Sequence, residues 1–331
     1  MKSNSLFANR EFLLALIVAA LVVAVGIRAP VFLTGESLVN VLTDTSFLFM
    51  LTLAQMAIII TRGIDLSVAA NLALTGMIVA LFSRANPDVP LYVIIIMSIM
   101  IGAALGAVNG AFVAFVGIPP IVVTLGTLAI FRGLIFLLAG GEWLTSKDMN
   151  KDFLDFPHAV LLGIPSLIWV ALVVTALYWL LYCQTQFGRG LYAIGGNPVA
   201  ARYCGINIPF EQFVVYTLAG AVSGLCGYLW VARYGIAFVD NAQGFELTII
   251  AACVIGGVSI AGGIGSVSGA LLGALFLGVI VNALPVINVS PFWQMLISGV
   301  VILAAVIVNA RSERPIGKLI LASARKKVAA S

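Results

Sequence analysis

The chain has 331 residues, of which 62% are hydrophobic and only 9% are charged, and its mean hydropathy is +1.15. Soluble domains carry about 25% charged residues, so this composition excludes a soluble globular protein and indicates a chain that lies mostly in lipid. The chain has a single histidine, His158, which is too few for a histidine-based metal site or a histidine proton relay. Its four cysteines lack CxxC spacing. We therefore expect no metal and no cofactor.

Apolar segments follow one another along most of the sequence and predict an all-α polytopic membrane protein with about ten transmembrane helices. A spanning helix needs about 20 apolar residues, so the third and eighth segments are short and are expected to be partial or broken spans. The first segment has a basic flank but no cleavage motif after it, and we expect it to be retained. The segments cover residues 12–28, 43–61, 67–83, 91–116, 121–139, 166–183, 211–233, 246–260, 266–284 and 292–309.

Two polar turns interrupt the apolar pattern, and we expect both to be structural. The first is Gly63-Ile64-Asp65-Leu66-Ser67, and the second is the glycine cluster Gly256–Gly265. Unpaired backbone groups cannot face lipid, so each turn must lie at an interface or within packed protein. Matching breaks at an offset of 194 residues predict a weak internal repeat, as in transporters built from repeats. The turn residues singled out are Gly63, Asp65, Ser67, Gly256, Gly257 and Gly263.

Charge asymmetry predicts the orientation. With a cytoplasmic N-terminus and ten spans, eleven of the 17 lysines and arginines and four of the 13 carboxylates fall on the inner side. The cation excess sets topology, so both termini, the 184–209 loop and both polar turns are predicted to be cytoplasmic, and the 140–165 loop periplasmic. Residues 1–331 are expected to form one domain with a core at 35–310, and residues 310–331 a basic cytoplasmic tail.

The 184–209 loop is the most specific element of the sequence. Asn197 can cap a short helix that begins at Pro198, and Gly205 can end that helix in the left-handed conformation. A short capped helix between two spans suits contact with a cytoplasmic partner, although a plain surface turn is the alternative. The residues expected to make this contact are Asn197, Pro198, Ala200, Ala201, Arg202 and Gly205.

These motifs together resemble the permease subunits of the ribose/xylose/arabinose class of ABC importers. The resemblance is carried by residues 63–67, 187–189, 193–198, 200–202, 205–206 and 256–265, and it spans roughly residues 35–310. Ala69-Ala70 stands where the family usually has a glycine, and Cys204 where it often has serine. The resemblance implies cytoplasmic ABC ATPase subunits, a second permease copy or paralogue, and a periplasmic solute-binding protein in the bacterial inner membrane. It also implies that the 197–205 helix enters a groove on the ATPase.

Polar residues inside the spans are candidates for a translocation path. Arg132 is the one deep charge; it should face protein or a water-filled path, either as a substrate or gate contact or as an internal strut. For each of the others, a helix-packing hydrogen bond is the alternative. The candidates are Asn71, Thr75, Asn109, Thr124, Thr127, Arg132 and Asn282.

The sequence therefore predicts a transmembrane permease that imports a monosaccharide or similar solute. The chain has no Gly-x₄-Gly-Lys-[Ser/Thr] motif and no Ser/His/Asp constellation, so it is not expected to be an enzyme and ATP hydrolysis falls to a partner. The alternative is an ion-coupled secondary transporter, against which the lack of buried carboxylates argues. The lipid bilayer is the surrounding partner, and no nucleic acid is expected.

Overall fold

The computed structural model describes residues 10–287 together with residues 289, 290, 293, 296, 299, 300 and 303. Within this part, eight helices are long and apolar enough to cross a membrane, which confirms an all-α polytopic fold. The eighth predicted segment, 246–260, is a short helix of 11 residues, as expected, whereas the third is an unbroken helix of 18 residues, Val68–Ala85, and a candidate span, contrary to expectation. Most of the tenth, 292–309, lies outside the described residues, as do both termini and the basic tail.

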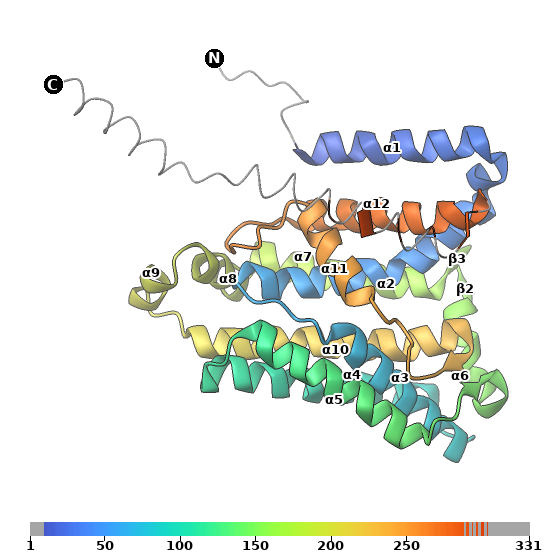
Figure 1. Ribbon diagram of the computed structural model, residues 1–331, viewed down its shortest axis with the longest axis horizontal. Coiled ribbons are helices and arrows are strands. Elements are labelled where there is room, and N and C mark those ends of the chain that lie inside the picture. The colour runs from blue at the N-terminus through green and yellow to red at the C-terminus, as the bar shows by residue number, and fades with distance from the viewer. Residues whose placement is uncertain are drawn as a thin grey trace.

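The long helices lie side by side in one layer-like bundle (Figure 1). They are α1 (Arg10–Arg28), α2 (Gly35–Ile60), α3 (Val68–Ala85), α4 (Leu91–Ala111), α5 (Pro120–Ala139), α7 (Ser166–Gln184), α10 (Ile208–Tyr234) and α12 (Val267–Val286). The shorter helices are α6 (Lys151–Asp155), α8 (Gln186–Gly196), α9 (Pro198–Tyr203) and α11 (Phe245–Ile255), with single turns at Pro30–Leu33, Phe112–Val116, Ser146–Asp148 and Phe156–His158.

Two small antiparallel sheets join loops between the helices. Strand β1 (Leu144–Thr145) pairs with β4 (Ile236–Ala237), with Leu144 opposite Ala237. Strand β2 (Val160–Leu161) pairs with β3 (Ile164–Pro165) in a tight hairpin. Both sheets therefore close the end of the bundle that carries the 140–165 loop.

Helix α2 is the central helix of the subunit. Its residues from Phe47 to Ile60 are almost all buried, and α7, α10, α11 and α12 are packed around it. The polar residues Thr52 and Gln55 in this part of α2 are therefore enclosed by protein and not by lipid. Helices α4 and α5 lie at the periphery and leave large apolar side chains exposed, as expected for surfaces that face lipid or another membrane subunit.

Glycine ridges bring helix backbones into direct contact. Gly102 and Gly106 on α4 face Gly220 and Gly224 on α10 so closely that a Cβ at any of these positions would overlap the opposite backbone. Small residues permit this close approach of the two helices. It strengthens the dispersion contacts between them, which matter in lipid because the hydrophobic effect does not drive helices together there. The ridges on α4 and α10 are thus packing surfaces inside one bundle.

The two long loops lie at opposite ends of the bundle. Helices α8 and α9 lie at one end, whereas α6 and the strands β2 and β3 lie at the other (Figure 1). Both polar turns lie at the α8 end, because the Gly263 N–H donates to the Ile60 carbonyl oxygen at 2.9 Å. This arrangement agrees with a repeat whose two breaks face the same side of the membrane.

The placement of the loops predicts a labelling pattern. In a background with Cys183→Ser and Cys204→Ser, a Lys147→Cys variant should react with a membrane-impermeant thiol reagent added outside intact cells. An Arg189→Cys variant should react only after the membrane is opened, because charge asymmetry places residues 184–209 inside. Labelling of both from one side would contradict the bundle geometry, and the reverse pattern would invert the orientation.

Candidate translocation path and coupling surface

The first polar turn is built around the Asp65 carboxylate. Its Oδ1 accepts hydrogen bonds from the backbone N–H and the hydroxyl of Ser67, both at 2.7 Å. The Asn109 amide on α4 donates to the Ser67 hydroxyl at 2.7 Å, and the Thr124 hydroxyl on α5 donates to the Ile64 carbonyl at 3.2 Å. Burial raises the pKa of Asp65, and the two bonds from Ser67 oppose that rise. The turn lies within packed protein, as predicted.

Three segments that are distant in sequence meet beside this turn, and we call them the glycine junction: Ile60–Arg62, Gly195–Gly196 and Gly262–Gly263. The Arg62 guanidinium donates from Nε to the Gly195 carbonyl at 2.8 Å and from Nη2 to the Gly196 carbonyl at 3.2 Å. A Cβ on Gly195 would overlap the Ile60 carbonyl oxygen. The junction therefore joins the end of α2, the end of α8 and the second polar turn through backbone contacts.

Helix α9 has the predicted caps. The Asn197 side chain accepts from the backbone N–H groups of Val199 and Ala200, both at 3.1 Å, and Gly205 has φ +83°. Ala200 and Arg202 are exposed, but Ala201 is only 3% exposed, so its side chain is not part of the exposed surface of this helix. Sequence reasoning missed Tyr203, which is 89% exposed at the end of this helix. An aromatic side chain with this degree of solvent exposure is a typical anchor for a protein partner.

Most of the candidate path residues pair with one another or with backbone. Asn71 donates to the Gly102 carbonyl at 3.1 Å, Thr75 donates to Asn71 at 3.1 Å, and Thr127 donates to the Thr124 carbonyl at 3.3 Å. Together with Asn109 and Thr124, they hold α3, α4 and α5 around the first turn. These geometries support the alternative of helix-packing hydrogen bonds for this group.

Arg132 contacts a loop that enters the bundle. Its Nη1 donates to the carbonyls of Val239 at 2.6 Å and Asn241 at 2.8 Å, and Asn241 is buried. The expectation that this arginine faces protein with an acceptor in reach is confirmed, and the contacts fit an internal strut. The segment between β4 and α11 is thereby fixed to α5.

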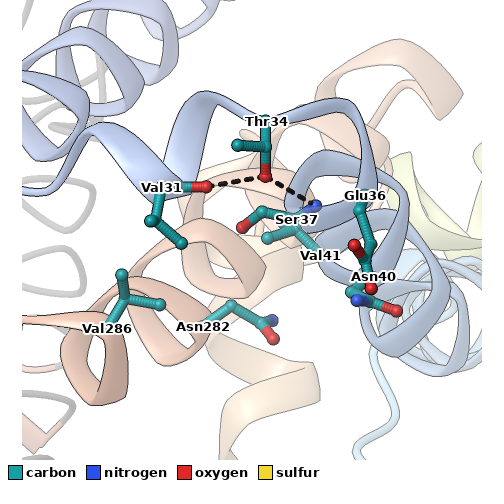
Figure 2. A pocket seen from close by; sticks show the side chains of 8 residues that line it. All are labelled: Val31, Thr34, Glu36, Ser37, Asn40, Val41, Asn282 and Val286. Atoms are coloured by element: carbon teal, nitrogen blue, oxygen red, sulfur yellow. Dashed lines mark hydrogen bonds between the residues drawn. The ribbon is translucent and has the colours of Figure 1, made fainter.

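Asn282 differs from the other candidates because it lines open space. Its Nδ2 donates to the Gly278 carbonyl at 2.9 Å on α12, and the residue borders two cavities against α2. The wider cavity lies at the N-terminal end of α2, beside Glu36, Ser37 and Asn40 (Figure 2). Sequence reasoning did not select these α2 residues.

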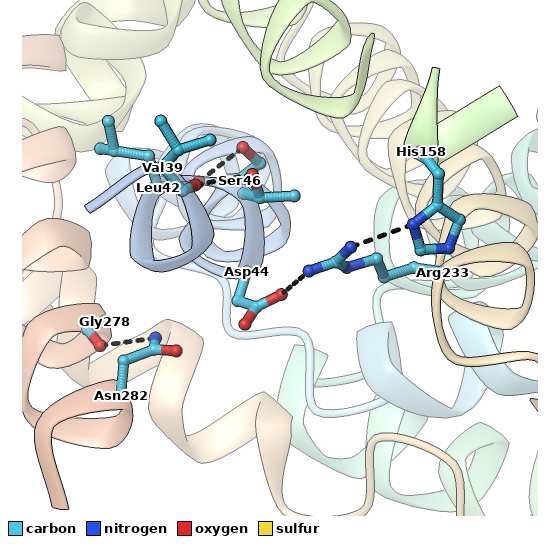
Figure 3. A network of polar contacts seen from close by, with 9 residues as sticks. Val39, Leu42, Asp44, Ser46, His158, Arg233, Gly278 and Asn282 are labelled. Carbon is cyan, nitrogen blue, oxygen red and sulfur yellow. Dashed lines mark hydrogen bonds and ion pairs between the residues drawn. The ribbon is translucent and has the colours of Figure 1, made fainter. Parts of the chain in front are cut away.

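A polar network that the sequence did not reveal lies close to the second cavity. The Asp44 carboxylate on α2 forms an ion pair with Arg233 on α10 at 3.3 Å, and Arg233 Nη1 lies 3.2 Å from His158 Nδ1 (Figure 3). The arrangement ties α2, α10 and the 140–165 loop together. It also holds the carboxylate in one position at the edge of the cavity.

Comparison with known proteins identifies the family. The model of the family described as "branched-chain amino acid transport system / permease component" matches residues 37–306. The ribose import permease RbsC of Escherichia coli K12 is 37% identical over 307 residues, which cover 92% of this chain and 94% of that protein. The D-allose permease AlsC of the same strain is 36% identical over 296 residues, 89% of each chain. The autoinducer 2 import permease LsrC of Shigella flexneri is 33% identical over 303 residues, 92% of this chain and 87% of that one. No solved structure matches significantly.

The chain therefore belongs to this family of transport permeases. It is the membrane subunit of an ABC importer, a multi-pass protein of the bacterial inner membrane that works with a cytoplasmic ATPase and a periplasmic binding protein. ATP hydrolysis belongs to the separate ATPase subunit. Family membership favours this function over an ion-coupled secondary transporter.

The contacts of Arg132 generate a stability prediction. Arg132→Ala should leave the Val239 and Asn241 carbonyls without their donor and destabilise the folded subunit by about 1–3 kcal/mol. The loss should appear as a lower melting temperature of the purified protein in detergent. The control is Arg189→Ala, which removes an exposed arginine and should leave the melting temperature unchanged. Equal melting temperatures for both variants would contradict the strut.

Proposed function

We propose that the substrate imported by this permease is a monosaccharide or a similar neutral polyol. The observation that carries the proposal is the 37% identity, across nearly the whole chain, with a permease named for ribose import. A second relative is named for D-allose. The hydroxyl, amide and carboxylate groups along α2 and α12 suit a neutral solute with many hydroxyls, because they can both donate and accept hydrogen bonds.

The full topology is also part of the proposal. Ten spans with both termini in the cytoplasm would make residues 1–331 one permease domain, with its core at 35–310 and a basic cytoplasmic tail at 310–331. The family match over residues 37–306 supports a single domain of this extent. A second permease copy or a paralogue would complete the membrane unit, with the exposed apolar faces of α4 and α5 available to lipid or to that partner.

Helix α9 is proposed as the contact that couples the permease to the ATPase. Asn197, Pro198 and Gly205 fix the ends of the helix, and Ala200, Arg202 and Tyr203 supply its exposed side. Ala201 packs inward and holds the helix on the loop. The glycine junction lies next to α9 in the chain and joins the end of α8 to both polar turns. A displacement of α9 would therefore be transmitted to α2 and α12 through the contacts of this junction.

The polar turns then have distinct roles. Gly63, Asp65 and Ser67 fix the start of α3, whereas Gly256, Gly257 and Gly263 permit the sharp path from α11 to α12. Gly257 and Gly263 have φ of +96° and +75°, a region that favours glycine. We propose that Asn282 lines the path and that Asn71, Thr75, Asn109, Thr124, Thr127 and Arg132 hold the surrounding helices in place.

Substrate class can be tested in proteoliposomes that contain the permease, its ATPase and its binding protein. We expect ATP-dependent uptake of labelled D-ribose or D-allose and no uptake of L-leucine. Uptake should stop without ATP and should not respond to a proton or sodium gradient. Uptake of leucine but of neither sugar would refute the sugar assignment, and gradient-driven uptake without ATP would refute the transport class.

Coupling through α9 can be tested with Ala200→Trp. A bulky ring on the exposed side should lower ATP-dependent uptake at least tenfold, or stop the ATPase from copurifying, while the permease still inserts into the membrane. The matched control is Ala159→Trp, an exposed alanine at the opposite end of the bundle. Wild-type assembly and uptake by Ala200→Trp would show that α9 is not the coupling contact. Ala201→Trp is unsuitable because that residue is buried.

A further inference from the structure

The second polar turn, residues 256–265, contains few side chains that could hold its own shape. Five of its ten residues are glycines, and φ is positive at Gly257, Gly262 and Gly263. Glycine permits such a path but leaves the backbone the most freedom to bend. The turn nevertheless joins α11 to α12, and its Gly263 N–H donates to the Ile60 carbonyl. Groups outside the turn must therefore hold it in one shape.

The amino-terminal end of α1 supplies such groups. The Glu11 carboxylate accepts a hydrogen bond from the Ser266 hydroxyl at 2.5 Å on one oxygen and from the Ser268 hydroxyl at 2.8 Å on the other. Arg10 Nη2 donates to the Val254 carbonyl at 3.3 Å, just before the turn. The two residues thus hold the chain on both flanks of the turn. We call these contacts of Arg10 and Glu11 the amino-terminal clamp.

Glu11 also determines how α12 begins. Ser266 is the N-cap residue of α12, and its hydroxyl oxygen accepts from the Gly269 backbone N–H at 3.1 Å. A hydroxyl has one proton to donate, and because Glu11 accepts it, the oxygen stays oriented toward the first turn of the helix. The charge of Glu11 lies near the positive end of the α12 dipole, which stabilises the same arrangement.

The 184–209 loop and the end of α2 hold the same turn through separate contacts. The Tyr192 hydroxyl on α8 donates to the Gly265 carbonyl at 3.0 Å. A Cβ on Gly262 would overlap the Arg62 side chain, so the two residues are in close contact. The second polar turn is therefore the segment at which α1 meets the elements of the glycine junction.

Helix α1 is attached to α12 at its other end as well. It is a peripheral helix that packs mainly against α12 and the turn Pro30–Leu33 (Figure 1). Phe32 in that turn is fully buried in a small core together with Val25 of α1 and Ala283 of α12. The clamp at one end and this core at the other join the two helices along their length. A displacement of the start of α12 should therefore carry α1 with it.

We propose that Glu11 is a positioning residue for the coupling of ATP hydrolysis to transport. By holding Ser266 and Ser268 it keeps the second polar turn in one shape. A displacement that arrives through the glycine junction then moves α12 and α1 instead of bending the turn. Glu11 acts through the two serines and contacts neither solute nor nucleotide in this role. The inference rests on the proposed coupling through α9 and extends it to the amino-terminal helix.

The first test compares solute uptake with ATP hydrolysis in proteoliposomes that contain the complete importer. Glu11→Ala should lower the number of solute molecules imported per ATP at least threefold while ATP hydrolysis continues. The control is Arg28→Ala, which removes an exposed charged side chain from the other end of α1 and should leave this ratio unchanged. A merely structural role would lower uptake and hydrolysis together and keep their ratio, and that result would overturn the proposal.

A second comparison asks whether Glu11 acts through its serine partners. Ser268→Ala should lower the ratio by a smaller factor, because Ser266 still binds Glu11. The double variant Glu11→Ala/Ser268→Ala should be no worse than Glu11→Ala alone, since residues that act through one contact do not have additive effects. Effects that multiply in the double variant would show that the two residues act independently and would contradict the clamp.

A reversible bridge can replace the carboxylate. In the Cys183→Ser, Cys204→Ser background, Glu11→Cys with Ser268→Cys should show the low ratio of Glu11→Ala. A short bis-methanethiosulfonate reagent, with the bridge verified by mass spectrometry, should restore at least half of the lost ratio. Dithiothreitol should remove both the bridge and the gain. A bridged protein that remains uncoupled would overturn the proposal, even if the substitutions themselves lower the stability of the subunit.

The outcomes separate this inference from the proposed function. The ratio is measured with whichever solute the wild type imports, so the sugar assignment does not affect the test. Uncoupling by Ala200→Trp together with a normal ratio in Glu11→Ala would overturn the clamp and leave coupling through α9 intact. Normal coupling in Ala200→Trp would overturn coupling through α9 and, with it, this inference.

Discussion

The arrangement of the subunit depends on one contact, the hydrogen bond from the Gly263 backbone to the Ile60 carbonyl at the glycine junction. It fixes the end of α2 against the turn that precedes α12, and Arg62 adds the end of α8 from the same place. Gly263 and Gly195 both meet Ile60 backbone to backbone, so no side chain lies between these segments to absorb a displacement, and the Arg62 side chain adds a further link to the end of α8. Movement of any one segment must therefore move the other two.

The polar side chains of the bundle fall into two groups with different energetic roles. The Asn71 amide donates to α4, the Thr75 hydroxyl donates to Asn71 on the same helix, and the Asn109 amide nitrogen donates to Ser67 in the first turn, so these donors contribute to packing. Thr45 and Gln55 on α2 have none among the described residues. Buried polar groups without partners are rare and costly, so the second group lowers the stability of the bundle where the first raises it.

Local signals in the sequence predicted much of this structure. Hydropathy placed 121–139 and 211–233 within a few residues of α5 and α10, and Asn197 with Gly205 gave the ends of α9. Hydropathy placed the start of α2 at residue 43 and not at Gly35, because Glu36 and Asn40 interrupt the apolar run; both line the wider cavity. The inward direction of Ala201 and the partners of Arg132 depend on tertiary contacts, so no local pattern could reveal them.

The enclosure of α2 has a consequence for the membrane in which the protein resides. At 26 residues, α2 is about 39 Å long, whereas the hydrocarbon core of a bilayer is about 30 Å thick. A lipid-facing helix of that length would tilt to hide the excess, but α2 is surrounded by other helices. Peripheral helices such as α1 and α5 should therefore be the ones that tilt when the thickness of the bilayer changes. Lipid composition would then alter how the subunit sits in the membrane while leaving the geometry of its interior unchanged.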